Sequence, residues 1–99
     1  MKSINVTVPW KQGLHLRAAS RVFQVARNFR SQIQLQLDST VADAGSVLSM
    51  MLLSAGLGSQ LSVHAYGDDE HEAIRALQNV FAGPGIEESE VTFPSEIAA

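Results

Sequence analysis

The sequence predicts an α+β domain of order βαββαβα. This order predicts an open-faced two-layer sandwich, in which helices cover one face of a four-stranded antiparallel sheet. Three segments alternate polar and apolar residues, as half-buried strands do. Other segments repeat apolar residues every three or four positions, which is typical of amphipathic helices. A chain of 99 residues is long enough to bury one such two-layer core.

The first predicted strand covers residues 3–8 and ends at Pro9. Its core-facing residues are Ile4, Val6 and Val8. In the loop that follows, we expect the ring of Trp10 to pack on the core rather than to contact a ligand. The spacing then predicts a helix from Leu16 to about Asn28. Its apolar face comprises Ala19, Val22, Phe23, Ala26 and Phe29.

A hairpin and a short helix are predicted next. Residues 32–37 and 40–42 alternate on either side of the turn-forming pair Asp38–Ser39, which indicates two adjacent strands. The apolar run 47–53 predicts a helix of about two turns, with Ser46 near its N-cap.

The last strand and the last helix complete the predicted domain. Residues 61–66 alternate again and place His64 on the surface. The last helix is expected to be capped by Asp68 or Asp69, and Gly83–Pro84–Gly85 stops it. Its apolar stripe comprises Ala73, Ile74, Leu77, Val80 and Phe81. The domain thus spans residues 1–85, and residues 86–99, with four glutamates, are expected to form a disordered or loosely packed acidic tail.

Composition excludes several classes of function. The chain has no cysteine, and its three histidines lack the spacing of a metal motif, so we expect no metal site. No apolar run approaches the roughly twenty residues of a membrane span, and Met1–Asn5 lacks the apolar block of a signal peptide. The net charge of −3 and the few aromatic residues argue against nucleic acid. These features predict a cytoplasmic protein.

The basic residues are concentrated in the first predicted helix. Four of the seven, Arg17, Arg21, Arg27 and Arg30, fall in one window without an acidic residue. They form either a surface for an acidic protein partner or a solvated helix face.

Residues 13–20 contain the strongest functional signal. A flexible Gly13 precedes His15, which stands at the start of the first helix. The first backbone N–H groups of a helix have no intrahelical acceptor and attract anions. Here these are expected to be the N–H groups of residues Leu16 to Ala19, Ala18 included. Arg17 adds a full positive charge with several donors. An imidazole in this position can carry a phosphoryl group, although the alternative that His15 merely caps the helix remains open.

The segment Gly13-Leu14-His15-x-Arg17-x-Ala19 resembles the active-site signature of HPr, the histidine-containing phosphocarrier of the bacterial phosphoenolpyruvate-dependent sugar phosphotransferase system. The resemblance extends from Met1 to about Gly83 and includes Ser46, where the family carries a regulatory serine. The family's fold is the open-faced sandwich.

The resemblance implies a carrier rather than an enzyme, without a cofactor. It would accept a phosphoryl group on Nδ1 of His15 from a PEP-dependent protein kinase of the enzyme I type. It would then pass the group to a sugar-permease component of the enzyme II type. Arg17 and the backbone amides of Leu16 and Ala18 would surround the phosphate. The carrier is expected to be a monomer that neither binds nucleic acid nor inserts into a membrane.

A partner-binding surface is expected around this site. The resemblance places it on the first helix, and the short second helix has more apolar residues than one stripe can bury, which leaves an exposed patch. The expected contact residues are Leu16, Ser20, Arg21, Gln24, Arg27, Val47, Leu48, Met51 and Leu52. A serine kinase or phosphatase acting on Ser46 would be a further partner.

The sequence departs from the family at three positions. Ala18 replaces the usual proline, so the first turn has one more N–H and a less restricted φ. Ser54 stands where a glycine usually follows the second helix, and Gln24 stands at a position that is often basic. Two alternatives to the phosphocarrier remain: a regulatory module controlled by phosphorylation of Ser46, and a small domain that binds through its sheet face.

Overall fold

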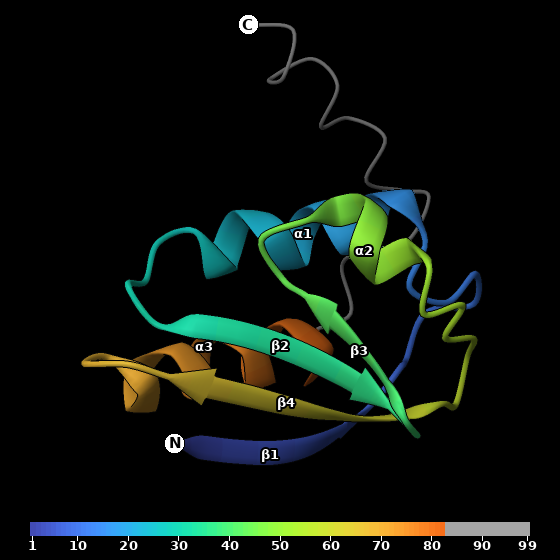
Figure 1. Ribbon diagram of the computed structural model, residues 1–99. Helices are drawn as coiled ribbons and strands as arrows, with labels where there is room; N and C mark the ends of the chain where they lie inside the picture. The colour runs from blue at the N-terminus through green and yellow to red at the C-terminus, as the bar shows by residue number, and fades with distance from the viewer. Residues whose placement is uncertain (83–99) are drawn as a thin grey trace, which may run out of the picture.

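The computed structural model describes residues 1–82, and these form the predicted βαββαβα order (Figure 1). The elements are β1 (Lys2–Thr7), α1 (Leu16–Ala26), β2 (Gln32–Leu37), β3 (Thr40–Asp43), α2 (Val47–Met51), β4 (Gln60–Tyr66) and α3 (Glu70–Ala82). The predicted helix stop at Gly83–Pro84–Gly85 and the acidic tail lie outside the described residues.

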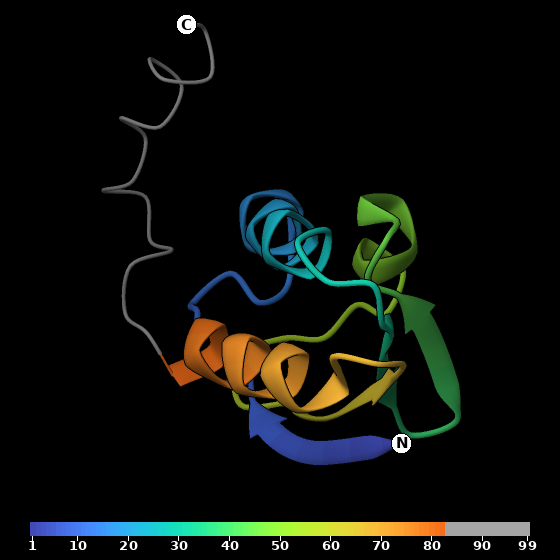
Figure 2. The same ribbon diagram turned by 90° about the vertical axis from the view of Figure 1, so that its left-hand side faces the viewer.

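The four strands form one antiparallel sheet in the order β1-β4-β2-β3. The three helices lie on one side of it, as the two views in Figures 1 and 2 show. Helix α3 packs on β1 and β4, α2 packs on β3, and α1 contacts both other helices. This arrangement confirms the open-faced sandwich.

The core lies between the sheet and the helices, and it contains the alternate residues of each strand. Val6, Leu35, Leu61 and Val63 are buried from the sheet side, and Leu77 is buried from α3. Ile4, predicted to face the core, is only partly buried because β1 is an edge strand. The strand periodicity therefore predicted the inner face of the sheet.

The opposite face of the sheet is polar. His64 is paired in register with Ser3 on one side and Gln34 on the other. Its Nδ1 lies 2.7 Å from the Ser3 hydroxyl and its Nε2 lies 3.0 Å from Oε1 of Gln36. His64, predicted to be a surface residue, is half-buried in this network of side chains.

Two helix boundaries differ from the predictions, and Asp69 stands at the predicted position before the last helix. Helix α1 ends at Ala26 rather than near Asn28. Helix α2 has five residues, fewer than the predicted two turns. Asp69 directly precedes α3, but its carboxylate accepts hydrogen bonds from Arg30 and Ser31 in the α1–β2 connection. That side chain therefore ties two segments together, a role that a local capping pattern does not reveal.

Candidate functional site

The β1–α1 loop that carries His15 is fixed at both ends. At its beginning, the backbone N–H of Val8 donates to Ser59 at 2.8 Å, and the N–H of Gly58 donates to Val8 at 2.9 Å. Near its end, the N–H of Leu14 donates to the carbonyl of Ala55 at 2.8 Å, and the Leu14 side chain is buried. The α2–β4 loop thus holds the residue that precedes His15.

Gly13 allows the two loops to approach this closely. Its φ is +76°, in the left-handed region that glycine adopts without strain. A Cβ at this position would overlap the carbonyl oxygen of Ala55 and lie 2.9 Å from Cα of Gly56. The glycine before the histidine is therefore required by backbone contact.

His15 is the N-cap residue of α1, with extended backbone angles of φ −99° and ψ −164°. Its side chain makes no capping hydrogen bond, and the residue is half-buried. The imidazole is therefore not used to close the helix end. Its carbonyl accepts the first helical hydrogen bond, from the N–H of Ala19 at 2.8 Å. The expectation that the Ala19 amide belongs to the anion-binding set is therefore wrong, because that donor is already used.

The remaining amides of the first turn lie on Leu16, Arg17 and Ala18, which directly follow His15. The side chain of Leu16 is 59% exposed, that of Arg17 is half-buried, and Ala18 is fully buried. The methyl group of Ala18 therefore packs into the core. The first helical residues accept proline readily because their N–H groups have no helical acceptor, so alanine here leaves one more donor.

The outer face of α1 is polar and basic. Arg21, Gln24 and Arg27 are exposed, and Ser20 is half-buried. The guanidinium of Arg27 lies 5.7 Å from the centre of the Phe23 ring, which is a cation–π contact. The predicted α1 contact residues thus lie on one accessible face.

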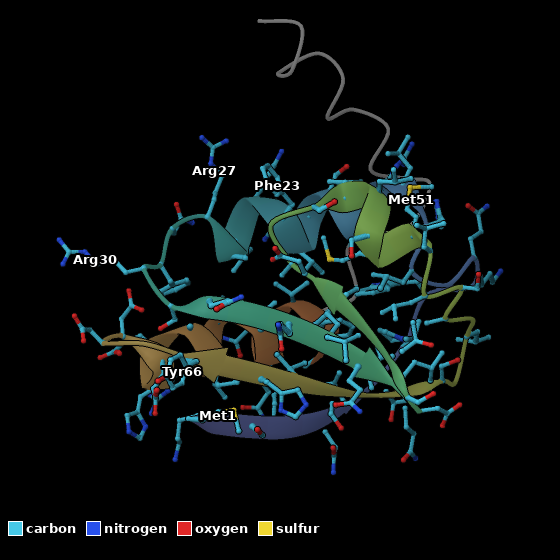
Figure 3. The ribbon with its side chains drawn as sticks, in the orientation of Figure 1. Met1, Phe23, Arg27, Arg30, Met51 and Tyr66 are labelled. Atoms are coloured by element: carbon cyan, nitrogen blue, oxygen red, sulfur yellow. The ribbon has the colours of Figure 1, made fainter. Side chains whose placement is uncertain are left out.

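Helix α2 adds an apolar surface beside α1, and the two helices are in contact. Leu48 and Leu52 are 67% and 69% exposed, as the excess of apolar residues predicted, whereas Val47 and Met51 are half-buried. Figure 3 shows Met51, Phe23 and Arg27 on the side formed by α1 and α2, and Met1 and Tyr66 on the opposite side. The structure thus brings the predicted contact residues of both helices to one side.

Ser46 is the N-cap residue of α2, as predicted. Its hydroxyl oxygen accepts a hydrogen bond from the backbone N–H of Ser49 at 3.1 Å, and its side chain is half-buried. It lies two residues before the exposed Leu48. A change of charge at this hydroxyl would therefore act next to the apolar surface.

Within residues 1–82 the structure shows no group of three His, Asp or Glu side chains that could hold a metal ion. Among the described helices, none has the length and apolar character needed to cross a membrane. His71 is exposed in the first turn of α3, away from α1 in sequence. His15 is the N-cap residue of its helix, whereas His71 lies within the first turn of α3.

Sequence reasoning missed one contributor to this site and marked a second, Ser54, only as a departure from the family. The carbonyl of Ala55 holds Leu14, and Ser54 adopts a left-handed φ of +56° just before it. The signal for Ser54 was present, because the family usually has glycine there. The role of Ala55 had no local signal, since it depends on the contact between two distant loops.

The described residues thus form a small open-faced α+β sandwich in which a histidine is the N-cap residue of the first helix. The family model described as "PTS HPr component phosphorylation site" matches residues 2–83. The chain therefore belongs to the HPr family of phosphocarrier proteins of the phosphotransferase system, which are carriers rather than enzymes.

Individual relatives agree with this assignment. The phosphocarrier protein HPr of Cupriavidus necator is 38% identical over 78 residues, which cover 79% of this chain and 88% of that protein. The phosphocarrier protein NPr of Klebsiella oxytoca is 34% identical and covers 77% of this chain and 86% of its own length. The crystal structure of HPr-C-His from Thermoanaerobacter tengcongensis matches with a TM-score of 0.77 and 35% identity, covering 85% of this chain and 99% of that one.

Proposed function

We propose that this protein carries a phosphoryl group on Nδ1 of His15. The observation that supports this most directly is the state of His15: it is half-buried rather than fully enclosed at the N-cap of α1, and its imidazole makes no capping hydrogen bond. It is held there by a loop with fixed ends. A ring that is placed by a fixed loop and does not cap the helix is suited to receive a group from a partner.

The transfer exchanges one phosphorus–nitrogen bond for another. The lone pair on Nδ1 of a neutral His15 attacks the phosphorus of a phosphohistidine on the donor, and the donor's P–N bond breaks as the new one forms. The released electron pair returns to the donor imidazole. A reaction of this kind depends chiefly on positioning and on stabilisation of charge on the phosphoryl oxygens. The amides of Leu16 and Ala18 and the charge of Arg17 supply that stabilisation.

The proposed partners follow from the family and from the surface. The donor is a PEP-dependent protein kinase of the enzyme I type, and the acceptor is a sugar-permease component of the enzyme II type. Both dock on the face that carries Leu16, Arg21, Leu48 and Leu52. In this proposal the carrier is a cytoplasmic monomer, with residues 1–85 as the carrier domain and 86–99 as an appended acidic tail.

The experiment is labelling with radioactive phosphoenolpyruvate and an enzyme I type kinase. We expect the wild-type protein to become labelled and His15→Ala to remain unlabelled. His71→Ala is the matched control, because His71 is also accessible but lies on α3. Labelling that persists in His15→Ala would place the phosphoryl group elsewhere and overturn the proposal.

A second candidate function is a regulatory module that is switched at Ser46. It is favoured by the position of the Ser46 hydroxyl at the start of α2, next to the exposed Leu48. A phosphate there adds about −1.5 to −2 charges, which the helix N-terminus tolerates and an acidic partner repels. Two assays separate the candidates. If the protein restores sugar phosphorylation in an extract that lacks its own carrier, the result supports transfer of a phosphoryl group through His15. Failure to restore it, together with labelling of Ser46 by an ATP-dependent kinase, supports regulation.

A further inference from the structure

Between the buried Val8 and Gly13, one side chain of the β1–α1 loop is buried. Of residues 9–12, Pro9, Lys11 and Gln12 are exposed, whereas Trp10 is only 2% exposed. The side-chain packing that holds this part of the loop against the body of the protein therefore comes from Trp10.

Trp10 connects two elements through different groups. Its ring packs against the ring of Phe81 in the last turn of α3, with a centroid distance of 5.1 Å and an interplanar angle of 40°. Its carbonyl accepts the backbone N–H of Gly13 at 2.9 Å and so closes the turn that leads to His15. A displacement of the indole would therefore move the turn that directly precedes the histidine.

Trp10 stabilises the loop through the apolar packing of its indole and not through a hydrogen bond of the indole N–H. The indole Nε1 is buried and has no hydrogen-bond partner among the described residues. A buried donor without an acceptor is unfavourable, so the N–H does not stabilise the loop. Phenylalanine would keep an aromatic face against Phe81 and omit this donor, which makes Trp10→Phe the conservative variant.

We propose that Trp10 is a positioning residue for His15: it seats the β1–α1 loop on Phe81 and thereby holds the imidazole where phosphoryl transfer requires it. The inference rests on the proposed function of His15. It adds a dependence of the site on the C-terminal end of α3. Because small misplacements of a reacting group reduce rates strongly, this anchoring is expected to appear in the transfer rate.

The test compares Trp10→Ala, Trp10→Phe and the control Leu77→Ala at a temperature where all are folded. Leu77→Ala removes a fully buried side chain from the same helix and so controls for a general loss of stability. We expect Trp10→Ala to slow transfer to His15 by at least about 10-fold, and the other two to stay within about 3-fold of wild type. Phe81→Leu is the substitute variant if Trp10→Ala does not fold, with a smaller decrease in the same direction.

A second readout does not depend on phosphorylation. The ¹H–¹³C cross-peaks of the His15 ring should shift in Trp10→Ala and stay near their wild-type positions in Trp10→Phe and Leu77→Ala. Trp10 is the sole tryptophan of the chain, so its emission reports the seating of the loop and should change when His15 is phosphorylated.

The outcomes are distinct. Equal slowing by Leu77→Ala and Trp10→Ala, or unchanged transfer and ring cross-peaks in a folded Trp10→Ala, would overturn the positioning role. Absence of transfer to wild-type His15 would instead overturn the proposed function, while the cross-peak comparison would still decide whether Trp10 positions the ring.

Discussion

Gly13 and Ser54 both adopt left-handed backbone angles, with φ of +76° and +56°, and they lie in the two loops that meet beside His15. The N–H of Leu14 and the carbonyl of Ala55, each one residue further along, form the hydrogen bond that joins these loops. The local conformation of two single residues thus determines where the proposed phosphate acceptor lies.

Gly13→Ala should destabilise the protein through both strain and overlap. The expected decrease in the free energy of unfolding is about 2–4 kcal/mol, measured by urea denaturation. The control is Gly58→Ala: Gly58 has a φ of +87° but an open environment, so only the strain of about 1 kcal/mol should appear. Equal losses in the two variants would show that contact with Ala55 does not matter.

Ser54→Gly should stabilise the protein. Ser54 follows α2 in a conformation that disfavours an L-residue, and glycine removes that strain while it increases the freedom of the unfolded chain. We expect a net gain on the order of 0.5–1 kcal/mol in the free energy of unfolding. A loss of stability would indicate that the serine hydroxyl makes a compensating contact.

Asp69, directly before α3, is hydrogen-bonded to the connection between α1 and β2. Its carboxylate accepts hydrogen bonds from the backbone N–H of Arg30 at 2.8 Å and of Ser31 at 2.9 Å, and from the Ser31 hydroxyl at 2.5 Å. The Ser31 hydroxyl, followed by the Arg30 amide, holds the pKa of this carboxyl below its ordinary value. The α1–β2 connection is therefore tied to the first turn of α3 by an ionised group.

This pKa shift predicts a pH dependence of stability. A carboxyl whose pKa is lower in the folded state stabilises the protein above its unfolded pKa of about 4, and that stability is lost as the pH falls through the folded pKa. Asp69→Asn should therefore lower the urea midpoint at pH 7, with the difference from wild type shrinking below about pH 4. The neighbouring, exposed Asp68→Asn is the control and should leave the midpoint nearly unchanged. A difference that is independent of pH would contradict the assignment.

Substitutions of neighbouring leucines at α2 should distinguish an effect on partner binding from an effect on the stability of the protein. Leu48→Ala and Leu52→Ala should change the free energy of unfolding by no more than about 0.5 kcal/mol, because both side chains are exposed. Leu53→Ala, at a position only 5% exposed, should cost about 2–5 kcal/mol. If α2 docks a partner, the first two variants weaken binding to the donor kinase by about 5-fold or more in a titration, which corresponds to roughly 1 kcal/mol.

Positive and negative charges are concentrated on different helices of the molecule. Helix α1 carries arginines and no acidic residue, whereas α3 begins with Glu70 and Glu72. A net charge of −3 would by itself repel an acidic partner, so attraction requires the basic face of α1 to be presented first. If the proposed partner is acidic, this division of charge favours association with α1 toward it.

Arg21→Gln should therefore slow association with the donor kinase and reduce its dependence on ionic strength. Stopped-flow measurements between about 20 and 200 mM salt cover the range in which surface charges become screened. The matched control is Arg75→Gln, which removes the same charge from an exposed position on α3. Equal effects of the two substitutions would show that net charge, and not the α1 face, governs association.

The element order, the inner face of the sheet, the buried Trp10 and the N-cap position of Ser46 could all be predicted because each depends on local periodicity or local chemistry. Local chemistry alone left His15 as either a helix cap or a phosphate carrier, and the resemblance to the HPr signature is what singled it out as the carrier. The early end of α1 and the second role of Asp69 were not predictable, because packing selects these hydrogen-bond partners; the use of the Ala19 amide follows from the i→i−4 bonding of a helix that begins at Leu16.

The sequence by itself determined which residues alternate, where the helices start and which histidine stands at a helix N-terminus, because neighbours along the chain decide these features. Only the tertiary structure decided that Leu14 hydrogen-bonds to Ala55 and that the ring of Trp10 packs on Phe81. It also decided which residues of the α2 region, Leu48 and Leu52, stay exposed on the helix that contacts α1. These contacts join segments that are far apart in sequence, so they exist only once the helices have packed on the sheet.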